Sequence, residues 1–164
     1  MKLQEILDLF QFDEWAAGRT LESVSSVPEA KYLEDLKSSH GGMHGTLVHI
    51  YTSSLIWLQR WQGNTLPGPV TRVEIPNLES LKSHCREYRD RLGAYLANLD
   101  EEALNRPFSY SDLKGNRQSE PLFQQMQHLV NHASYHRGQV VTMLRQIGSK
   151  PTGTDLITFY RTRS

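Results

Sequence analysis

The sequence predicts an all-α fold, a four-helix bundle. Four long segments repeat apolar residues at the three- and four-residue spacing of one helix face. The breaks between them contain glycine, proline and asparagine, which favour turns. With 164 residues, the chain is predicted to form one domain over residues 1–164, because this length buries roughly two-thirds of the surface that the unfolded chain exposes.

The first two predicted helices span residues 3–24 and about 43–62. The first ends shortly before Pro28, and the second begins after Gly41 and Gly42. Apolar residues cover most of the circumference of the second helix, so this helix is expected to be deeply buried.

The third and fourth predicted helices span residues 77–99 and 119–147. Cys85 lies on the apolar stripe of the third and is expected to act as a small core residue. Pro121 is tolerated in the first turn of the fourth helix, and Gly148 provides its end. Between these helices, residues 106–122 contain an alternating stretch and a Lys-Gly-Asn turn, which predicts a small hairpin.

Composition and charge exclude several classes of partner. The 18 basic and 18 acidic residues cancel, so no net charge attracts nucleic acid or an anionic membrane. No apolar run reaches membrane-spanning length, and the first residues carry acids where a signal peptide is apolar. Cys85 has no second cysteine with which to form an internal disulfide. A cytoplasmic protein without nucleic-acid or membrane partners is therefore expected.

Three of the seven histidines, His128, His132 and His136, are spaced four residues apart on the fourth predicted helix. On a helical wheel His136 lies nearest the apolar face and His128 farthest from it, so His136 is expected to be the most buried. Residues four apart lie on one face, so either neighbouring pair can share an ion, as HxxxH zinc sites do. One ion cannot bind all three, since His128 and His136 are about 12 Å apart along the axis.

These imidazoles also have an ordinary explanation, in which a neighbouring hydroxyl or carbonyl satisfies each of them. A metal site needs further ligands, and the remaining histidines are His40, His44, His49 and His84. Two glycines interrupt the helical register between His40 and His44, and His84 is compatible with a surface position. His49 lies on the narrow polar sector of the second helix, but periodicity alone does not select it.

Two sequence blocks resemble the DinB-like, or YfiT-like, metalloproteins, which are four-helix bundles. The blocks are HGTLVHIYTSSLIWLQRW, residues 44–61, and QHLVNHASYHRGQVVTMLRQIG, residues 127–148. An early Phe-xx-Trp-Ala and a late Asp-Leu-Ile-xx-Tyr extend the resemblance over nearly the whole chain. One departure is Ala17, where this family often has asparagine.

The resemblance implies a divalent metal held by His49, His132 and His136, with His128 beside the site. Zinc and nickel suit imidazole ligands. The resemblance also implies a homodimer, which this family commonly forms, and a small-molecule substrate. Two candidate helpers are His128 and Arg137; Arg137 could bind an anionic substrate group or be an ordinary arginine of a helix surface.

Three protein ligands leave a coordination position open, where an ion activates bound water or a bound thiol. The resembled family includes thiol S-transferases and proteins assigned as hydrolases. The first hypothesis is therefore a metal-dependent enzyme that activates a low-molecular-weight thiol for S-transfer. The second is a hydrolase that uses metal-bound hydroxide, and the third is a non-catalytic protein with a structural or vestigial site.

Overall fold

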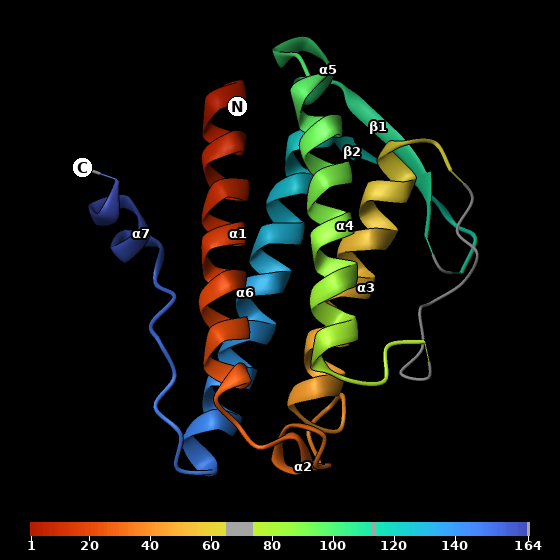
Figure 1. The fold of residues 1–164 in the computed structure, drawn as a ribbon. Helices are drawn as coiled ribbons and strands as arrows, with labels where there is room; N and C mark the ends of the chain where they lie inside the picture. Colours follow the sequence, from red (N-terminus) through yellow and green to blue (C-terminus); the bar gives the residue numbers. More distant parts are fainter. Residues whose placement is uncertain (65–73, 113, 164) are drawn as a thin grey trace.

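The computed structural model describes residues 1–64, 74–112 and 114–163. Four long helices lie side by side (Figure 1) and confirm the predicted all-α bundle. They are α1 (Leu3–Ser25), α3 (Met43–Trp61), α4 (Leu78–Ala97) and α6 (Leu122–Gln146). Helix α6 packs against both α1 and α3, so side chains from these two helices approach it from different sides.

Three short helices were not predicted: α2 (Glu29–Tyr32), α5 (Glu101–Asn105) and α7 (Leu156–Thr162). Each is too short to give a clear periodic signal. Helix α2 lies between α1 and α3, and α7 lies beside α1 at the C-terminal end of the chain (Figure 1). No helix of the described residues is both long and apolar enough to cross a membrane.

The predicted hairpin is present within residues 106–122, and its second strand includes residues that were predicted to begin the fourth helix. Strands β1 (Pro107–Ser111) and β2 (Arg117–Pro121) pair antiparallel, with Ser109 opposite Ser119. The predicted start of the fourth helix at Ser119 was therefore wrong. Residues 119–121 pair with β1 instead, and α6 begins only at Leu122, whose amide donates to the Arg106 carbonyl at 3.0 Å.

The apolar core divides into two clusters along the bundle. One gathers buried residues of α1, α3 and α6, including Ile6, Phe10, Leu58, Trp61, Met126 and Leu129. The other lies nearer the opposite end and includes Val24, Met43, Leu47, Leu81, Val140 and Leu144. Burial of these apolar surfaces stabilises the fold and fixes the positions of α3 and α6 relative to each other.

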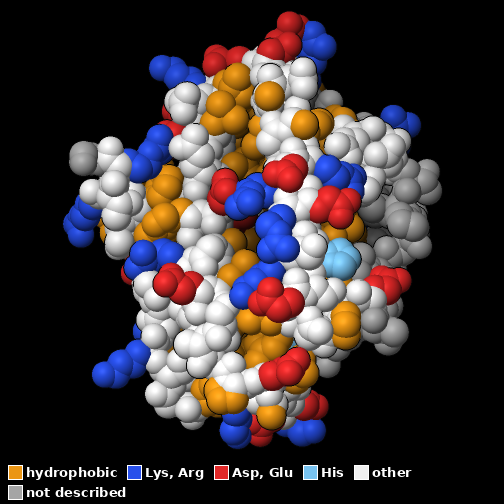
Figure 2. Space-filling model, viewed as in Figure 1, with side chains coloured by type: hydrophobic (Ala, Val, Ile, Leu, Met, Phe, Trp, Pro, Cys, Tyr) orange, Lys and Arg blue, Asp and Glu red, His pale blue; other side chains and the backbone are white. Residues whose placement is uncertain are grey.

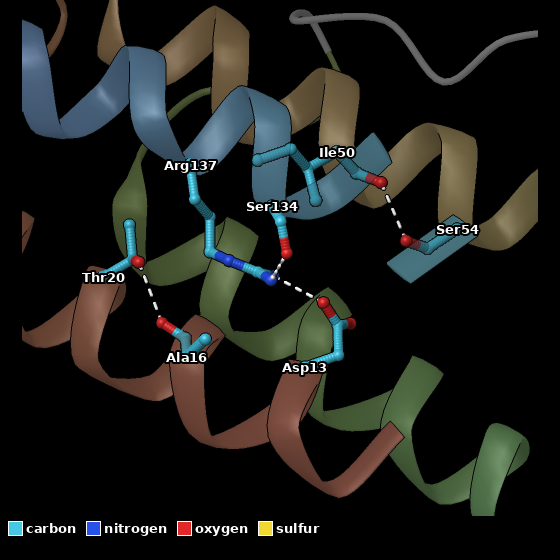
Figure 3. A network of polar contacts seen from close by, with 7 residues as sticks. All are labelled: Asp13, Ala16, Thr20, Ile50, Ser54, Ser134 and Arg137. Atoms are coloured by element: carbon cyan, nitrogen blue, oxygen red, sulfur yellow. Dashed lines mark hydrogen bonds and ion pairs between the residues drawn. The ribbon is translucent and has the colours of Figure 1, made fainter. Parts of the chain in front are cut away.

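An ion pair buried within the bundle connects α6 to α1. The guanidinium of Arg137 lies 2.5 Å from an Asp13 carboxylate oxygen and also donates to Ser134 Oγ at 2.9 Å (Figure 3). Only 3% of the Arg137 side chain is exposed, against 21% for Asp13. The arginine thus has its charge compensated inside the protein.

A groove of about 570 Å³ runs between α1 and α4. In Figure 2 it appears as a strip of hydrophobic side chains bordered by charged ones. Arg89 of α4 and Glu14 of α1 pair across it at 3.2 Å, and Cys85 contributes to its lining. None of the residues that line it is a histidine, so the groove is separate from the site described below.

Replacing either of two glycines with alanine is expected to change the free energy of unfolding, in opposite directions. A Cβ at Gly93, inside α4, would have no neighbour within 4 Å, whereas a Cβ at Gly42 would lie 2.1 Å from the Glu34 carbonyl oxygen. Gly93→Ala should raise the free energy of unfolding by about 1 kcal/mol, because alanine favours the helix. Gly42→Ala should lower it. Urea unfolding of both variants checks this, and destabilisation by Gly93→Ala would contradict the open space at that position.

Candidate metal centre

His49, His132 and His136 come together where α3 faces α6. The ring centroids of His49 and His132 are 5.0 Å apart, and each lies 4.5 Å from the centroid of His136. His49 Nε2 and His132 Nε2 are 3.1 Å apart. His132 and His136 are neighbours one helical turn apart on α6, and the packing of α3 against α6 supplies the third ring.

The dimensions of this trio are compatible with one bound ion. Imidazole nitrogens bind zinc at about 2.0–2.1 Å, which places two ligand atoms of a tetrahedral ion about 3.3 Å apart. The observed nitrogen separation of 3.1 Å between His49 and His132 is close to this value. The three ring planes are inclined to one another by 57°, 64° and 78°. Rings inclined in this way can direct their in-plane lone pairs toward a common point.

His40, in the segment between α2 and α3, belongs to the same cluster. One nitrogen from each of His40, His49 and His136 lies within 4.8 Å of the others. The His40 ring stacks on that of His49, with centroids 3.8 Å apart and planes 14° apart. His40, His49 and His136 could thus hold a metal ion, and His132 adjoins them.

Hydrogen-bond partners distinguish these histidines from an ordinary core histidine. Both ring nitrogens of buried His44 have partners, the Tyr32 hydroxyl at 2.9 Å and the Ile75 carbonyl at 2.8 Å. His132 differs, because its buried Nδ1 has no hydrogen-bond partner among the described residues and its Nε2 lies 3.1 Å from the Nε2 of another histidine, His49. Ordinary hydrogen bonding therefore accounts for both ring nitrogens of His44 but leaves Nδ1 of His132 without a partner among the described residues.

Gln139 orients His136 and was not among the site residues predicted from the sequence. An amide oxygen can only accept, so His136 Nδ1–H donates to Gln139 Oε1 at 2.8 Å. This hydrogen bond leaves the lone pair on Nε2, the nitrogen then available to an ion. The available signal was spacing, since Gln139 follows His136 by three residues and so lies on the same helix face.

The two candidate helpers lie in different surroundings. His136 is the most buried of the three α6 histidines, as predicted, and is 7% exposed, whereas His128 is an exposed residue. The His128 ring lies 6.0 Å from that of His132 and 5.6 Å from that of Trp57. Arg137 points toward Asp13 on α1 (Figure 3). Its head group is thus engaged in the bundle interior.

Burial keeps two histidines of the trio neutral. It lowers the pKa of His49 to about 4, helped by the neighbouring rings of His40, His136 and His132. Burial likewise lowers the pKa of His132 to about 4, with contributions from His136, His128 and His40. At neutral pH both imidazoles are uncharged, which is the state that a metal ion requires of its histidine ligands.

These pKa values predict how the stability of the metal-free protein depends on pH. In the unfolded chain a histidine binds a proton near pH 6.5, whereas His49 and His132 stay neutral in the folded state down to about pH 4. Between these values the unfolded state binds more protons, so stability is full above about pH 6.5 and decreases as the pH falls toward 4. Thermal midpoints of chelator-treated protein should show this decrease, and it should be smaller in His132→Ala. Parallel profiles for the two proteins would contradict the prediction.

Comparisons with known proteins agree with this architecture. The family model of the DinB family matches residues 1–163. Protein DinB of Bacillus subtilis (strain 168) is 28% identical over 152 residues, which cover 90% of this chain and 88% of that protein. A crystal structure of a DinB-like protein from Bacillus cereus ATCC 10987 has the same fold, with a TM-score of 0.57 and 19% identity. The match covers 88% of this chain and 94% of that one. The chain therefore belongs to the DinB family.

Proposed function

We propose that this protein binds one zinc or nickel ion through His49, His132 and His136 and activates a low-molecular-weight thiol for S-transfer. The observation that carries the proposal is the convergence of three inclined imidazoles, with Nε2 of His49 and Nε2 of His132 3.1 Å apart. The proposed ligands are the three histidines that the family resemblance implies, and their rings lie close together in this structure.

The ligand set suits activation of a nucleophile. Three neutral imidazoles leave the charge of a divalent ion uncompensated, and a tetrahedral ion with three protein ligands keeps one position open. An ion held by these residues would lower the pKa of a thiol or water bound to it. The protein holds the three nitrogens in place, and Gln139 fixes which nitrogen of His136 carries the proton.

The nucleophilic sulfur would have to come from a second substrate. Cys85 is the only cysteine of the chain, and it lines the groove between α1 and α4, whose lining includes none of the three proposed ligands. Burial raises the pKa of its thiol to about 11, so this thiol stays protonated and unreactive at neutral pH. These properties favour an external thiol and argue against a covalent enzyme intermediate on Cys85.

The Gln139 contact gives a prediction that concerns affinity alone. Gln139→Leu should weaken zinc binding about 10- to 100-fold, because outer hydrogen-bond partners orient the ligands and raise their basicity. Gln139→Glu keeps an acceptor for the His136 proton and should retain most of the affinity. Competition with a chromophoric chelator measures both variants. Equal affinity of wild type and Gln139→Leu would show that this hydrogen bond does not prepare the site.

Thiol consumption tests the reaction. Protein loaded with zinc or nickel is incubated with a panel of small thiols and electrophiles such as alkyl halides and epoxides, beside chelated protein and His132→Ala. The proposal expects thiol consumption that requires both the ion and His132. Ester or amide hydrolysis without thiol would instead establish the hydrolase, and absence of both activities in metal-loaded protein would identify a non-catalytic site.

A further inference from the structure

We propose that His40 is a positioning residue of the metal centre: its ring stacks on His49 and holds that ligand in its binding orientation, without itself binding the ion. This inference rests on the proposed function, because it takes His49 as a ligand. His40 is not one of the three ligands that the family resemblance implies.

The parallel stack argues against His40 and His49 binding one ion together. A histidine binds a metal along a nitrogen lone pair that lies in the plane of the ring. The planes of His40 and His49 are only 14° apart with centroids 3.8 Å apart, so an ion in the plane of one ring lies well above the plane of the other. By contrast, His49 and His132 are inclined by 57°. His40 therefore adjoins the ligand set without completing it.

The same stack restrains the orientation of the His49 ring. His49 is only half-buried and is the one ligand of the proposed trio that α3 supplies. Its ring turns about two side-chain bonds, and only some orientations point Nε2 toward His132. A flat ring against one face of the His49 imidazole, and the His136 ring inclined to it at 78°, restrict the orientations open to that ring. His40 thereby reduces the conformational freedom lost when the ion binds.

Backbone contacts fix the segment that carries His40. Ser38 and Gly41 form an antiparallel bridge, with hydrogen bonds of 3.3 and 2.9 Å between their backbone groups. Gly41 has φ of 86°, a conformation that favours glycine. Gly42 packs so closely on the Glu34 carbonyl that a Cβ would not fit. His40 is thus held at the centre by a tight turn, and its approach to His49 does not depend on a flexible loop.

Two substitutions separate stacking from coordination. His40→Phe keeps a flat ring but has no nitrogen, whereas His40→Ala removes both. Zinc affinity is measured by chelator competition, and the Co²⁺ absorption spectrum reports the coordination number and geometry of the ion, which change when a protein ligand is lost. We expect His40→Ala to weaken zinc binding about tenfold, His40→Phe to bind within about threefold of wild type, and both variants to keep the wild-type Co²⁺ spectrum. His84→Ala, which removes a histidine that bonds to the Ser80 carbonyl outside the cluster, is the matched control and should bind normally.

The remaining outcomes overturn the inference in distinguishable ways. If His40→Ala and His40→Phe lose zinc affinity equally and the Co²⁺ spectrum changes, His40 is a ligand. If they lose zinc affinity equally and the spectrum is unchanged, ring stacking does not position His49. Wild-type affinity in His40→Ala would show that it has no role, while leaving the proposed function intact. Absence of metal binding by the wild-type protein would refute the proposed function, and the inference with it.

Discussion

Replacing His132 with alanine is expected to reduce zinc affinity by more than the 10- to 100-fold typical of lost outer partners. His132 belongs to the proposed trio, because its ring contacts both His49 and His136 and its Nε2 lies 3.1 Å from His49 Nε2. Its loss would leave two ligands, too few for a stable site. Calorimetric titration of metal-free protein with Zn²⁺ measures the change.

The matched control for this substitution is His84→Ala. His84 lies outside the cluster, where its Nδ1 bonds to the Ser80 carbonyl at 2.8 Å, so its removal should leave zinc affinity unchanged. Equal losses in His84→Ala and His132→Ala would indicate nonspecific binding by surface histidines. Wild-type affinity in His132→Ala would remove this residue from the ligand set.

The second large effect concerns stability. Asp13→Ala should lower the free energy of unfolding by about 3 kcal/mol, because it leaves the guanidinium of Arg137 buried without its partner. For a chain of this length such a loss lowers the thermal midpoint by about 10 °C. Zinc affinity should change little, since the Arg137 head group points toward α1 (Figure 3). Thermal unfolding and zinc titration of one preparation measure both.

A double variant separates the cost of an unpaired charge from the loss of packing. Asp13→Leu combined with Arg137→Met replaces both partners with apolar side chains and should recover much of the lost stability. If Asp13→Ala alone costs less than about 1 kcal/mol, the pair behaves like a surface ion pair. The buried position of Arg137 would then contribute little to the bundle.

Periodicity predicted the parts of this structure that depend on local spacing. The four long helices, the hairpin and the greater burial of His136 all follow from residues close together in the chain. The strand that takes residues 119–121 was assigned to a helix, because its pairing partner β1 lies outside that window. Local spacing also did not reveal that Arg137 pairs with Asp13, which is 124 positions away.

The candidate site was only partly predictable for the same reason. Spacing on α6 identified the HxxxH pair, but the choice of His49 depended on resemblance to a family, since only tertiary packing brings α3 to α6. His40 follows from neither source. It reaches the cluster through a tight turn at Gly41 and Gly42, the glycines that made its helical register doubtful in the sequence.

Metal analysis of untagged protein tests the central claim most directly. Wild type and His136→Ala are purified in parallel, and the metal content and thermal midpoint of each are recorded before and after chelation. The proposed function predicts about one zinc or nickel per wild-type chain, loss of that metal in the variant, and little change of the midpoint on chelation. Metal-free wild-type protein, or unfolding when the metal is removed, would contradict an open, functional site.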